Sequence, residues 1–289
     1  MDSLIWESDV PQLRSPMLIC SFRGWNDAAN SSSRALASVA ESLDAELVAQ
    51  IDPEEFFDFQ TTRPTITLKD GQARHIEWPQ NNMYAARVPA ADRDLVLFDG
   101  TEPNLRWRNF SEGIATAADT LGAEMVITMG ALVAEVSHTL PVPITGLASS
   151  EELVEELDLE RSNYEGPTGI VGVVHDCCRQ LGMTSASLWA AVPHYVAAVP
   201  NPKAALALLR RLEGLTGIAV DATDLEAETS SYEEQVGRAV AANPEIEELV
   251  ERIEAEQAEQ IDAGGDLPSA DTIAREFQRF LRQRGGDAN

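Results

Sequence analysis

Short apolar runs alternate with helical segments from about residue 16 to residue 213, and this alternation limits the fold more than any other feature of the sequence. Residues 16–22 and 94–98 are short apolar runs of the kind that form buried strands. Strands that alternate with helices favour an α/β fold with a mostly parallel central sheet and flanking helices. The predicted strands are 16–22, 45–51, 65–69, 73–78, 83–88, 94–98, 124–129 and 185–192. The predicted helices are 28–43, 111–121, 151–157, 168–181 and 202–213.

The composition changes near residue 220. Residues 221–289 contain 18 Asp and Glu against 6 Arg, a net charge of 6 − 18 = −12. We therefore predict an α/β core domain over residues 1–222 and an acidic helical extension over residues 223–289. Three helices are expected in the extension: one capped by Ser230-Ser231, one that begins at Asn243-Pro244 and one capped by Ser269.

The whole chain is strongly acidic. Its 289 residues carry 21 Lys and Arg against 48 Asp and Glu, a formal net charge of −27. A surface of this sign repels phosphate backbones and anionic lipids, which argues against nucleic-acid and membrane partners. The three cysteines, two of them adjacent, do not form a disulfide framework, and the acidic N-terminal residues are unlike a signal peptide. A cytoplasmic protein is expected.

Common catalytic signatures are missing from the sequence. It contains no Gly-Lys-Ser/Thr phosphate loop, no Gly-x-Gly-x-x-Gly, no Gly-x-Ser-x-Gly, no His-Glu-x-x-His and no Cys-x-x-Cys. His175, Cys177 and Cys178 share one predicted helix, but no further ligands of suitable spacing accompany them for zinc. No metal or cofactor is predicted, and buried thiols explain the cysteines.

Candidate ligand-binding residues follow three predicted strands. Asn26 and Asp27 come after the first strand, Glu102 and Arg106 after strand 94–98, and His194 after strand 185–192. Ligands of open α/β sheets bind outside the carboxyl ends of the strands, so these five residues are predicted to contribute to one cleft. Residues 128–131 are predicted to be a loop of small residues beside it.

Each candidate also has a structural interpretation. Asn26 or Asp27 can cap the helix that follows, and a capping carboxylate repels an incoming anion. Surface ion pairs explain Arg106, and a hydrogen-bonded structural histidine explains His194. Residues 165–169 resemble an anion-binding nest without a basic partner. The structural interpretation is favoured at each position.

Several segments together resemble one family. They are Phe22-Arg23-Gly24-Trp25-Asn26-Asp27, residues 52–59 (Asp-Pro-Glu-Glu-Phe-Phe-Asp-Phe), residues 165–169 (Glu-Gly-Pro-Thr-Gly), residues 187–195 (Ser-Leu-Trp-Ala-Ala-Val-Pro-His-Tyr) and Leu267-Pro268-Ser269. In this order they are similar to the actinobacterial branch of the proteasome assembly chaperone 2 family, over residues 16–281. The resemblance implies a core like those of purine nucleoside phosphorylases and peptidyl-tRNA hydrolases, with a helical extension.

The resemblance also bears on function and partners. It implies a non-catalytic interaction or assembly protein, a homo-oligomer such as a trimer, and proteasome components as partners. Related proteins can end in a hydrophobic–Tyr–any tail that docks on the proteasome ring, whereas this chain ends Gly285-Gly286-Asp287-Ala288-Asn289. That departure argues against docking through the tail. The alternative, which rests on fold analogy, is a small-molecule-binding protein or an enzyme acting on a nucleoside-like ligand at the strand ends.

The tryptophans support association independently of the resemblance. Several of the five tryptophans lie in or beside predicted loops, where a monomer would expose them. The five are Trp6, Trp25, Trp78, Trp107 and Trp189. Exposed aromatic patches mark interfaces. We therefore expect a homo-oligomer built from the α/β core, although repulsion between chains of charge −27 opposes it.

Overall fold

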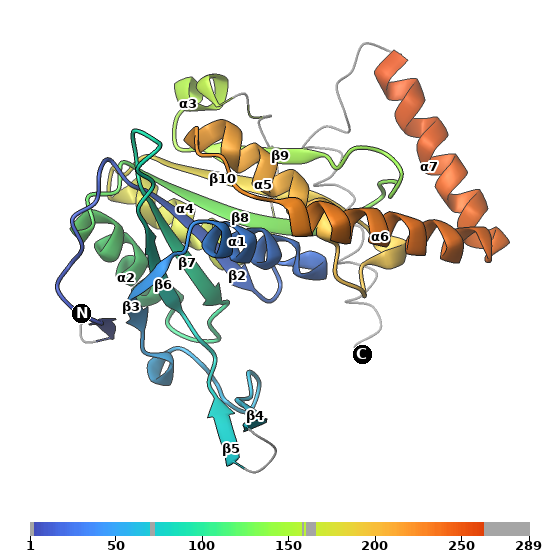
Figure 1. Cartoon of the computed structure of the whole chain (residues 1–289). Helices are drawn as coiled ribbons and strands as arrows, with labels where there is room; N and C mark the ends of the chain where they lie inside the picture. Colours follow the sequence, from blue (N-terminus) through green and yellow to red (C-terminus); the bar gives the residue numbers. More distant parts are fainter. Residues whose placement is uncertain (1–2, 70–72, 158, 160–165, 263–289) are drawn as a thin grey trace.

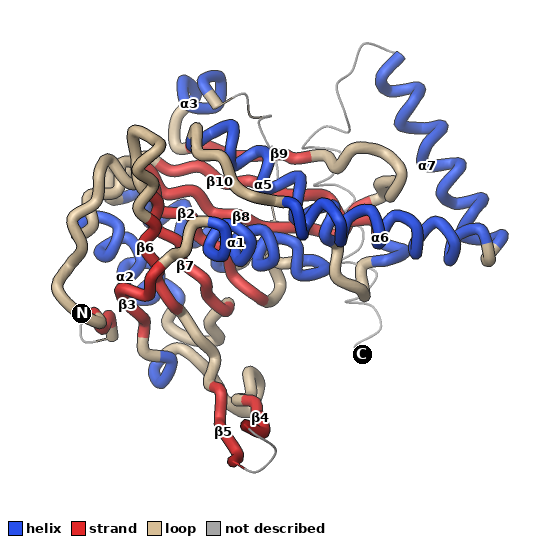
Figure 2. Tube along the Cα trace, viewed as in Figure 1, coloured by secondary structure: helices blue, strands red, loops and turns tan. Residues whose placement is uncertain are grey.

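Eight strands form one central sheet, in the order β1-β3-β6-β7-β2-β8-β10-β9. Figures 1 and 2 show this sheet with helices packed against it. The computed structural model describes residues 3–69, 73–157, 159 and 166–262. The strands of the sheet are β1 (Leu4–Trp6), β2 (Met17–Arg23), β3 (Glu46–Ile51), β6 (Asn82–Ala86), β7 (Leu95–Thr101), β8 (Met125–Ala134), β9 (Ile144–Ala148) and β10 (Ser185–Pro193).

The middle of the sheet is parallel and its margins are antiparallel. β2 pairs in parallel with β7 and with β8, and β8 pairs in parallel with β10. β6 joins β7 and β3 antiparallel, β1 joins β3 antiparallel, and β9 joins β10 antiparallel. β3 therefore runs in the same direction as the four central strands. The predicted mostly parallel α/β sheet is confirmed, and the carboxyl ends of five strands meet at one edge.

Helices cover both faces of this sheet because the central strands are apolar on both sides (Figure 1). Met17 and Ile19 of β2 pack in one core cluster, with residues of α1 (Ser31–Ser42) and α5 (Pro202–Thr216). Leu18, Cys20 and Phe22 point to the other face and pack with residues of α2 (Trp107–Thr120) and α4 (Ile170–Gln180). A shorter helix, α3 (Glu151–Glu156), follows β9.

A two-stranded hairpin projects from the body of the molecule (Figure 1). It is formed by β4 (Thr65–Lys69) and β5 (Ala73–Glu77), as the sequence predicts. Ile66 lies opposite Ile76 in the register, and Leu68 lies two residues further along β4 on the same face. Three apolar side chains therefore share one face of the hairpin with Arg74, which lies opposite Leu68.

The acidic extension begins with α6 (Thr223–Ala241), which packs on α5, and continues with α7 (Pro244–Asp262). The predicted start of α7 is confirmed, because Asn243 Oδ1 accepts a hydrogen bond from the Glu245 backbone N–H over 3.2 Å. The predicted cap at Ser230-Ser231 is wrong, because both serines lie inside α6. Ser230 Oγ instead donates to the carbonyl of Glu226, one turn earlier.

Other predictions in the extension are not tested. The helix predicted after Ser269 and the chain end at residues 285–289 lie outside the described residues. The division of the chain at residues 222 and 223 stays a prediction. Among the described residues, no helix is both long enough and apolar enough to cross a membrane.

Two further differences concern the strands. Residues 128–131 do not form the predicted loop, because β8 continues through them to Ala134 and all four are buried. The edge strands β1 and β9 were not predicted, because both are short and only partly buried.

Candidate functional site

The candidate residues lie where the central strands end. The loops that follow the carboxyl ends of β2, β7 and β10 carry Asn26 and Asp27, Glu102 and Arg106, and His194, respectively. The structure therefore places all five beyond the same edge of the sheet. Their contacts, described below, differ from one residue to the next.

Glu102 and Asn26 are joined directly. Glu102 Oε1 accepts hydrogen bonds from Asn26 Nδ2 over 2.7 Å and from the backbone N–H of Ile170 over 2.9 Å. Its Oε2 accepts from the backbone N–H of Trp25 over 3.3 Å. One carboxylate thus connects the loop after β2, the loop after β7 and the start of α4.

The start of α4 consequently holds an anion that belongs to the protein. Helix N-termini favour negative charge, and no side chain of its own segment caps α4. Gly169 precedes the helix against the Asn26 amide, so a Cβ at this position would lie 2.2 Å from Asn26 Oδ1. Part of the segment that resembles an anion-binding nest therefore packs against Asn26, and Glu102 accepts the hydrogen bond from the first helical N–H.

Asp27 caps α1. Its Oδ1 accepts from the backbone N–H groups of Ser32 and Ser33 over 2.7 and 3.3 Å and from the Ser32 hydroxyl over 2.8 Å. Its Oδ2 accepts from the Ser33 hydroxyl over 2.5 Å. The side chain is buried, and four donors surround its carboxylate. This is the capping role that the sequence favours for the position.

Arg106 and His194 make other contacts. Arg106 immediately precedes α2 and has a φ of 54°, and its guanidinium pairs with the Glu55 carboxylate over 2.7 Å at the surface. His194 opens a short 3₁₀ turn after β10 and packs edge-on against the ring of Tyr195, with ring centroids 5.5 Å apart. Hydrogen bonds thus join Asn26 to Glu102, while Asp27, Arg106 and His194 contact other residues. A single cleft for all five stays a prediction.

Two of the five candidate side chains have a buried polar atom without a hydrogen-bond partner among the described residues: Asn26 through Oδ1 and His194 through Nδ1. No group of three or more His, Cys, Asp or Glu side chains suited to a metal ion occurs in the described part of the chain. Both cysteines of α4 favour the protonated thiol, since burial raises the pKa of Cys177 and raises that of Cys178 to about 12. Cys20, Cys177 and Cys178 are all free.

Comparisons with known proteins identify relatives over most of the chain. The PAC2 family profile matches residues 21–240. A PAC2 family protein from Streptomyces avermitilis shares 41% sequence identity with a TM-score of 0.76, over 81% of this chain and 99% of that one.

The chain belongs to the PAC2 family.

Two structures from Mycobacterium tuberculosis are also similar to this PAC2 family chain. A proteasome-assembly chaperone homologue shares 40% identity with a TM-score of 0.75, over 81% of this chain and 99% of that one. A protein of unknown function shares 27% identity with a TM-score of 0.85, over 98% and 97%. A comparison with curated proteins finds no significant match.

The PAC2 chain also contains a polar cluster that sequence reasoning missed, between the core and the extension. The Tyr195 hydroxyl lies 2.8 Å from His138 Nδ1 and accepts from the His138 backbone N–H over 2.9 Å. Glu254 of α7 accepts from the hydroxyls of Ser137, over 2.7 Å, and Thr139. Lys203 donates to the His138 carbonyl over 2.7 Å and pairs with Glu233 of α6 over 2.6 Å. We call these residues the extension joint.

Burial dominates the protonation of the extension joint. It lowers the pKa of His138, and the positive charge of Lys203 lowers it further, against smaller opposite effects of Glu254 and Glu233. Burial also raises the pKa of the Tyr195 phenol. Tyr195 directly follows the predicted candidate His194, so the prediction identified the 3₁₀ turn that carries Tyr195. Nothing near His138 in the sequence marks it, because its partners come from distant segments.

Proposed function

We propose that this protein is a non-catalytic assembly protein whose partners are proteasome components. The observation that carries the proposal is the 40% identity to the proteasome-assembly chaperone homologue of M. tuberculosis, over 99% of that chain. The site chemistry supports it. The carboxylates of Asp27 and Glu102 accept hydrogen bonds from backbone N–H groups that begin α1 and α4, a structural use that leaves them poorly suited to acid–base catalysis.

The test is an assembly reaction with purified components. Proteasome α and β subunits from the same organism are mixed with and without the protein, and the formation of core particles is followed on native gels. We expect faster formation, with the protein bound to an assembly intermediate. Unchanged kinetics together with no bound protein would refute the proposal.

The proposal includes a homo-oligomer, with a trimer as the expected form. Ile66, Leu68 and Ile76 of the hairpin are 58%, 64% and 48% exposed and share one face. Trp25 is 41% exposed. Large apolar side chains exposed together support an interface between protein chains.

The expected cytoplasmic location and the absence of nucleic-acid partners belong to the same proposal. Three free cysteines support a reducing compartment, and a net charge of −27 opposes binding to phosphate backbones. A DNA column tests the second point. We expect no retention at low salt, and tight retention that salt abolishes would contradict it.

The alternative function, binding of a nucleoside-like ligand at the strand ends, is favoured by one observation. Asn26 Oδ1 and His194 Nδ1 are buried without hydrogen-bond partners among the described residues, and a polar ligand could supply them. A thermal-shift screen over nucleosides and phosphate tests it, because a ligand at 100 times its Kd stabilises a protein by about 2.7 kcal/mol.

A further inference from the structure

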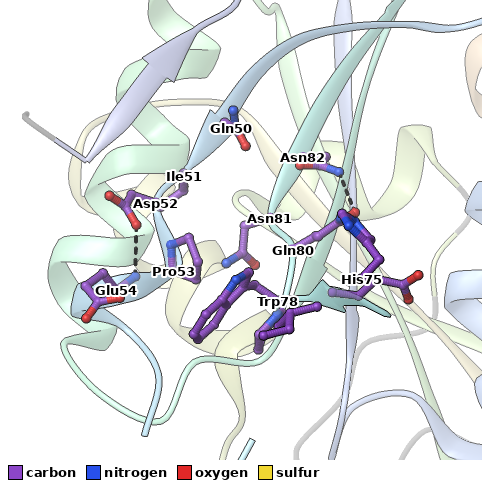
Figure 3. Close-up of a pocket in the computed structure, with 13 residues that line it drawn as sticks. Gln50, Ile51, Asp52, Pro53, Glu54, His75, Trp78, Gln80, Asn81 and Asn82 are labelled. Atoms are coloured by element: carbon purple, nitrogen blue, oxygen red, sulfur yellow. Dashed lines mark hydrogen bonds between the residues drawn. The ribbon is translucent and has the colours of Figure 1, made fainter. Parts of the chain in front are cut away.

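A pocket of about 470 Å³ opens at the carboxyl end of β3, where the body of the molecule meets the base of the β4–β5 hairpin. It is lined by residues 50–54 and 75–82 (Figure 3). Its volume lies in the range of ligand sites, about 300–1,000 Å³. Because β3 runs with the central strands, the pocket lies at the same edge of the sheet as the candidate residues above, but none of those residues lines it.

Asn81 provides an unused hydrogen-bond donor in this pocket. Its Oδ1 accepts from the Thr101 backbone N–H over 3.0 Å, which fixes the orientation of the amide. The Nδ2 group is buried and has no hydrogen-bond partner among the described residues, and the residue is 1% exposed. A buried donor without an acceptor is unfavourable, so a ligand that brings an acceptor such as a carbonyl oxygen would relieve it.

Trp78 and Pro53 both lie beside this amide (Figure 3). The Trp78 indole contacts the ring of Phe59, with centroids 4.8 Å apart and an angle of 66° between the rings, and remains 46% exposed. An indole held in place on one side and open on the other is a good surface for an aliphatic stem and for a cation above the ring.

The lining of the pocket is acidic. Asp52, Glu54 and Glu77 line it, and His75 is the only residue of its lining that can carry a positive charge. The Asp52 Oδ1 atom accepts from the Glu54 backbone N–H over 3.0 Å, which positions this carboxylate at the pocket (Figure 3). An acidic pocket with an open indole selects a cationic group, and the Asn81 donor selects a carbonyl beside it.

We propose that this pocket binds an arginine or lysine side chain on an extended segment of a partner protein. The cation lies against Trp78 near Asp52 and Glu54, and a backbone carbonyl of the same segment accepts from Asn81 Nδ2. The site is separate from the strand-end candidates. It does not rest on the proposed function, because a basic segment can belong to any partner, so either proposal can fail alone.

The test is an NMR titration of the full chain with acetyl-Ala-Arg-Ala-amide, against acetyl-Ala-Glu-Ala-amide as control. The Trp78 indole N–H and the Asn81 side-chain amide are followed, and the spectra of Trp78→Phe and Asn81→Asp assign them. We expect both signals to move with the arginine peptide and to show at least tenfold weaker binding of the glutamate peptide. Equal binding of the two peptides would overturn the proposal. So would the absence of any movement at about 10 mM peptide, because a site with a Kd of about 10 mM would be half-occupied there.

Two variants separate the cation contact from the carbonyl contact. Asp52→Asn/Glu54→Gln removes two charges and keeps an acceptor for the Glu54 N–H, so we expect roughly tenfold weaker binding of the arginine peptide. The matched control, Glu247→Gln/Glu251→Gln, removes the same charge from exposed positions of α7 and should bind normally. Equal affinities of the two double variants would overturn the proposal.

Asn81→Asp keeps the acceptor for Thr101 and loses the donor. Because the donor is lost, this variant should bind the arginine peptide more weakly. Ethylguanidinium has no carbonyl and should bind at least as well as before, because a negatively charged carboxylate replaces the neutral amide. Light scattering of each variant checks that the oligomeric mass is unchanged. If Asn81→Asp does not fold, the double variant and its control still decide the proposal.

Discussion

The Glu102 carboxylate holds together groups that are far apart in the sequence. Its partners Asn26 and Ile170 lie 76 and 68 residues away. The bond to the Ile170 N–H combines a charge-assisted hydrogen bond with the favourable field of a helix N-terminus. The acidic residue that the sequence offers as a ligand-binding candidate is therefore also part of the framework that positions the neighbouring loops.

Gly169→Ala should destabilise the protein. The added Cβ would lie 2.2 Å from Asn26 Oδ1 and 2.4 Å from Asn26 Nδ2. The Asn26 amide cannot easily move away from the added Cβ, because it is buried and hydrogen-bonded to Glu102. Overpacking of this kind costs about 1–3 kcal/mol, which urea unfolding measures. The matched control is Gly214→Ala inside α5, where nothing lies within 4 Å of the new Cβ. It should be neutral or stabilising by up to about 1 kcal/mol, and an equal loss in both variants would contradict the expectation.

Stability should fall on mild acidification because of His138. Burial lowers the pKa of this imidazole in the folded chain, so the unfolded chain binds the proton more readily. The contribution of the neutral His138 side chain to the free energy of unfolding is complete above about pH 6.5, the ordinary pKa of histidine. It is lost as the pH falls through the lower pKa that His138 has in the folded chain. Urea unfolding at a series of pH values measures it. His138→Gln should reduce the pH dependence without abolishing it, since burial also lowers the pKa of His175. An unchanged pH profile would show that His138 makes no such contribution.

At the scale of elements, the extension joint should control how firmly α7 docks. Glu254 bonds to Ser137 and Thr139 in the segment after β8. Hydrogen bonds to charged groups contribute about 1.5–3 kcal/mol each, so Glu254→Ala should speed amide hydrogen exchange in α7 by roughly tenfold or more. Exchange in β2 should not change. Glu251→Ala, which removes an exposed carboxylate from the same helix, is the control. Equal effects of the two substitutions would indicate a loss of helix charge only.

Elements with a strong local pattern could be predicted from the sequence. β2, β7 and β10 are apolar runs, and the hairpin surrounds Asp70-Gly71, so all four features were found. β1 and β9 were missed because three- and five-residue edge strands carry little pattern. Residues 128–131 were misassigned because small residues suit a tightly packed strand as well as a loop. Gly130, for example, faces the Trp189 ring, 2.7 Å from where a Cβ would lie.

The candidate site was predictable only in part, for a related reason. The topology of the strands places Asn26, Glu102 and His194 at one edge, which the alternation of strands and helices indicates. The cap at Asp27 is local and could be foreseen. The joining of Asn26 to Glu102 and the contact of His138 with Tyr195 depend on loop geometry across 76 and 57 residues of sequence. No local pattern encodes such contacts.

At the scale of the whole molecule, charge and apolar surface oppose each other. A chain of charge −27 repels its own copies, and salt screens this repulsion over a Debye length of about 8 Å at physiological ionic strength. The hairpin segment is close to neutral. Its segment 63–78 holds Arg63, Lys69 and Arg74 against Asp70 and Glu77, a net charge of 3 − 2 = +1. Association through the hairpin therefore opposes less like charge than association through the acidic extension, whose net charge is −12.

We expect light scattering at physiological salt to give a mass near three times 31.4 kDa, and to give less association at low salt. Ile66→Lys/Leu68→Lys should return the mass toward 31.4 kDa. The contact would then have to bury two ammonium groups where it now buries two apolar side chains, and burying an unpaired charge is unfavourable. Thr67→Lys, on the opposite face of the same strand, is the matched control and should stay oligomeric. A mass of 31.4 kDa for the unaltered chain across micromolar concentrations would exclude the oligomer, and dissociation of the control would show that the apolar face is not the contact.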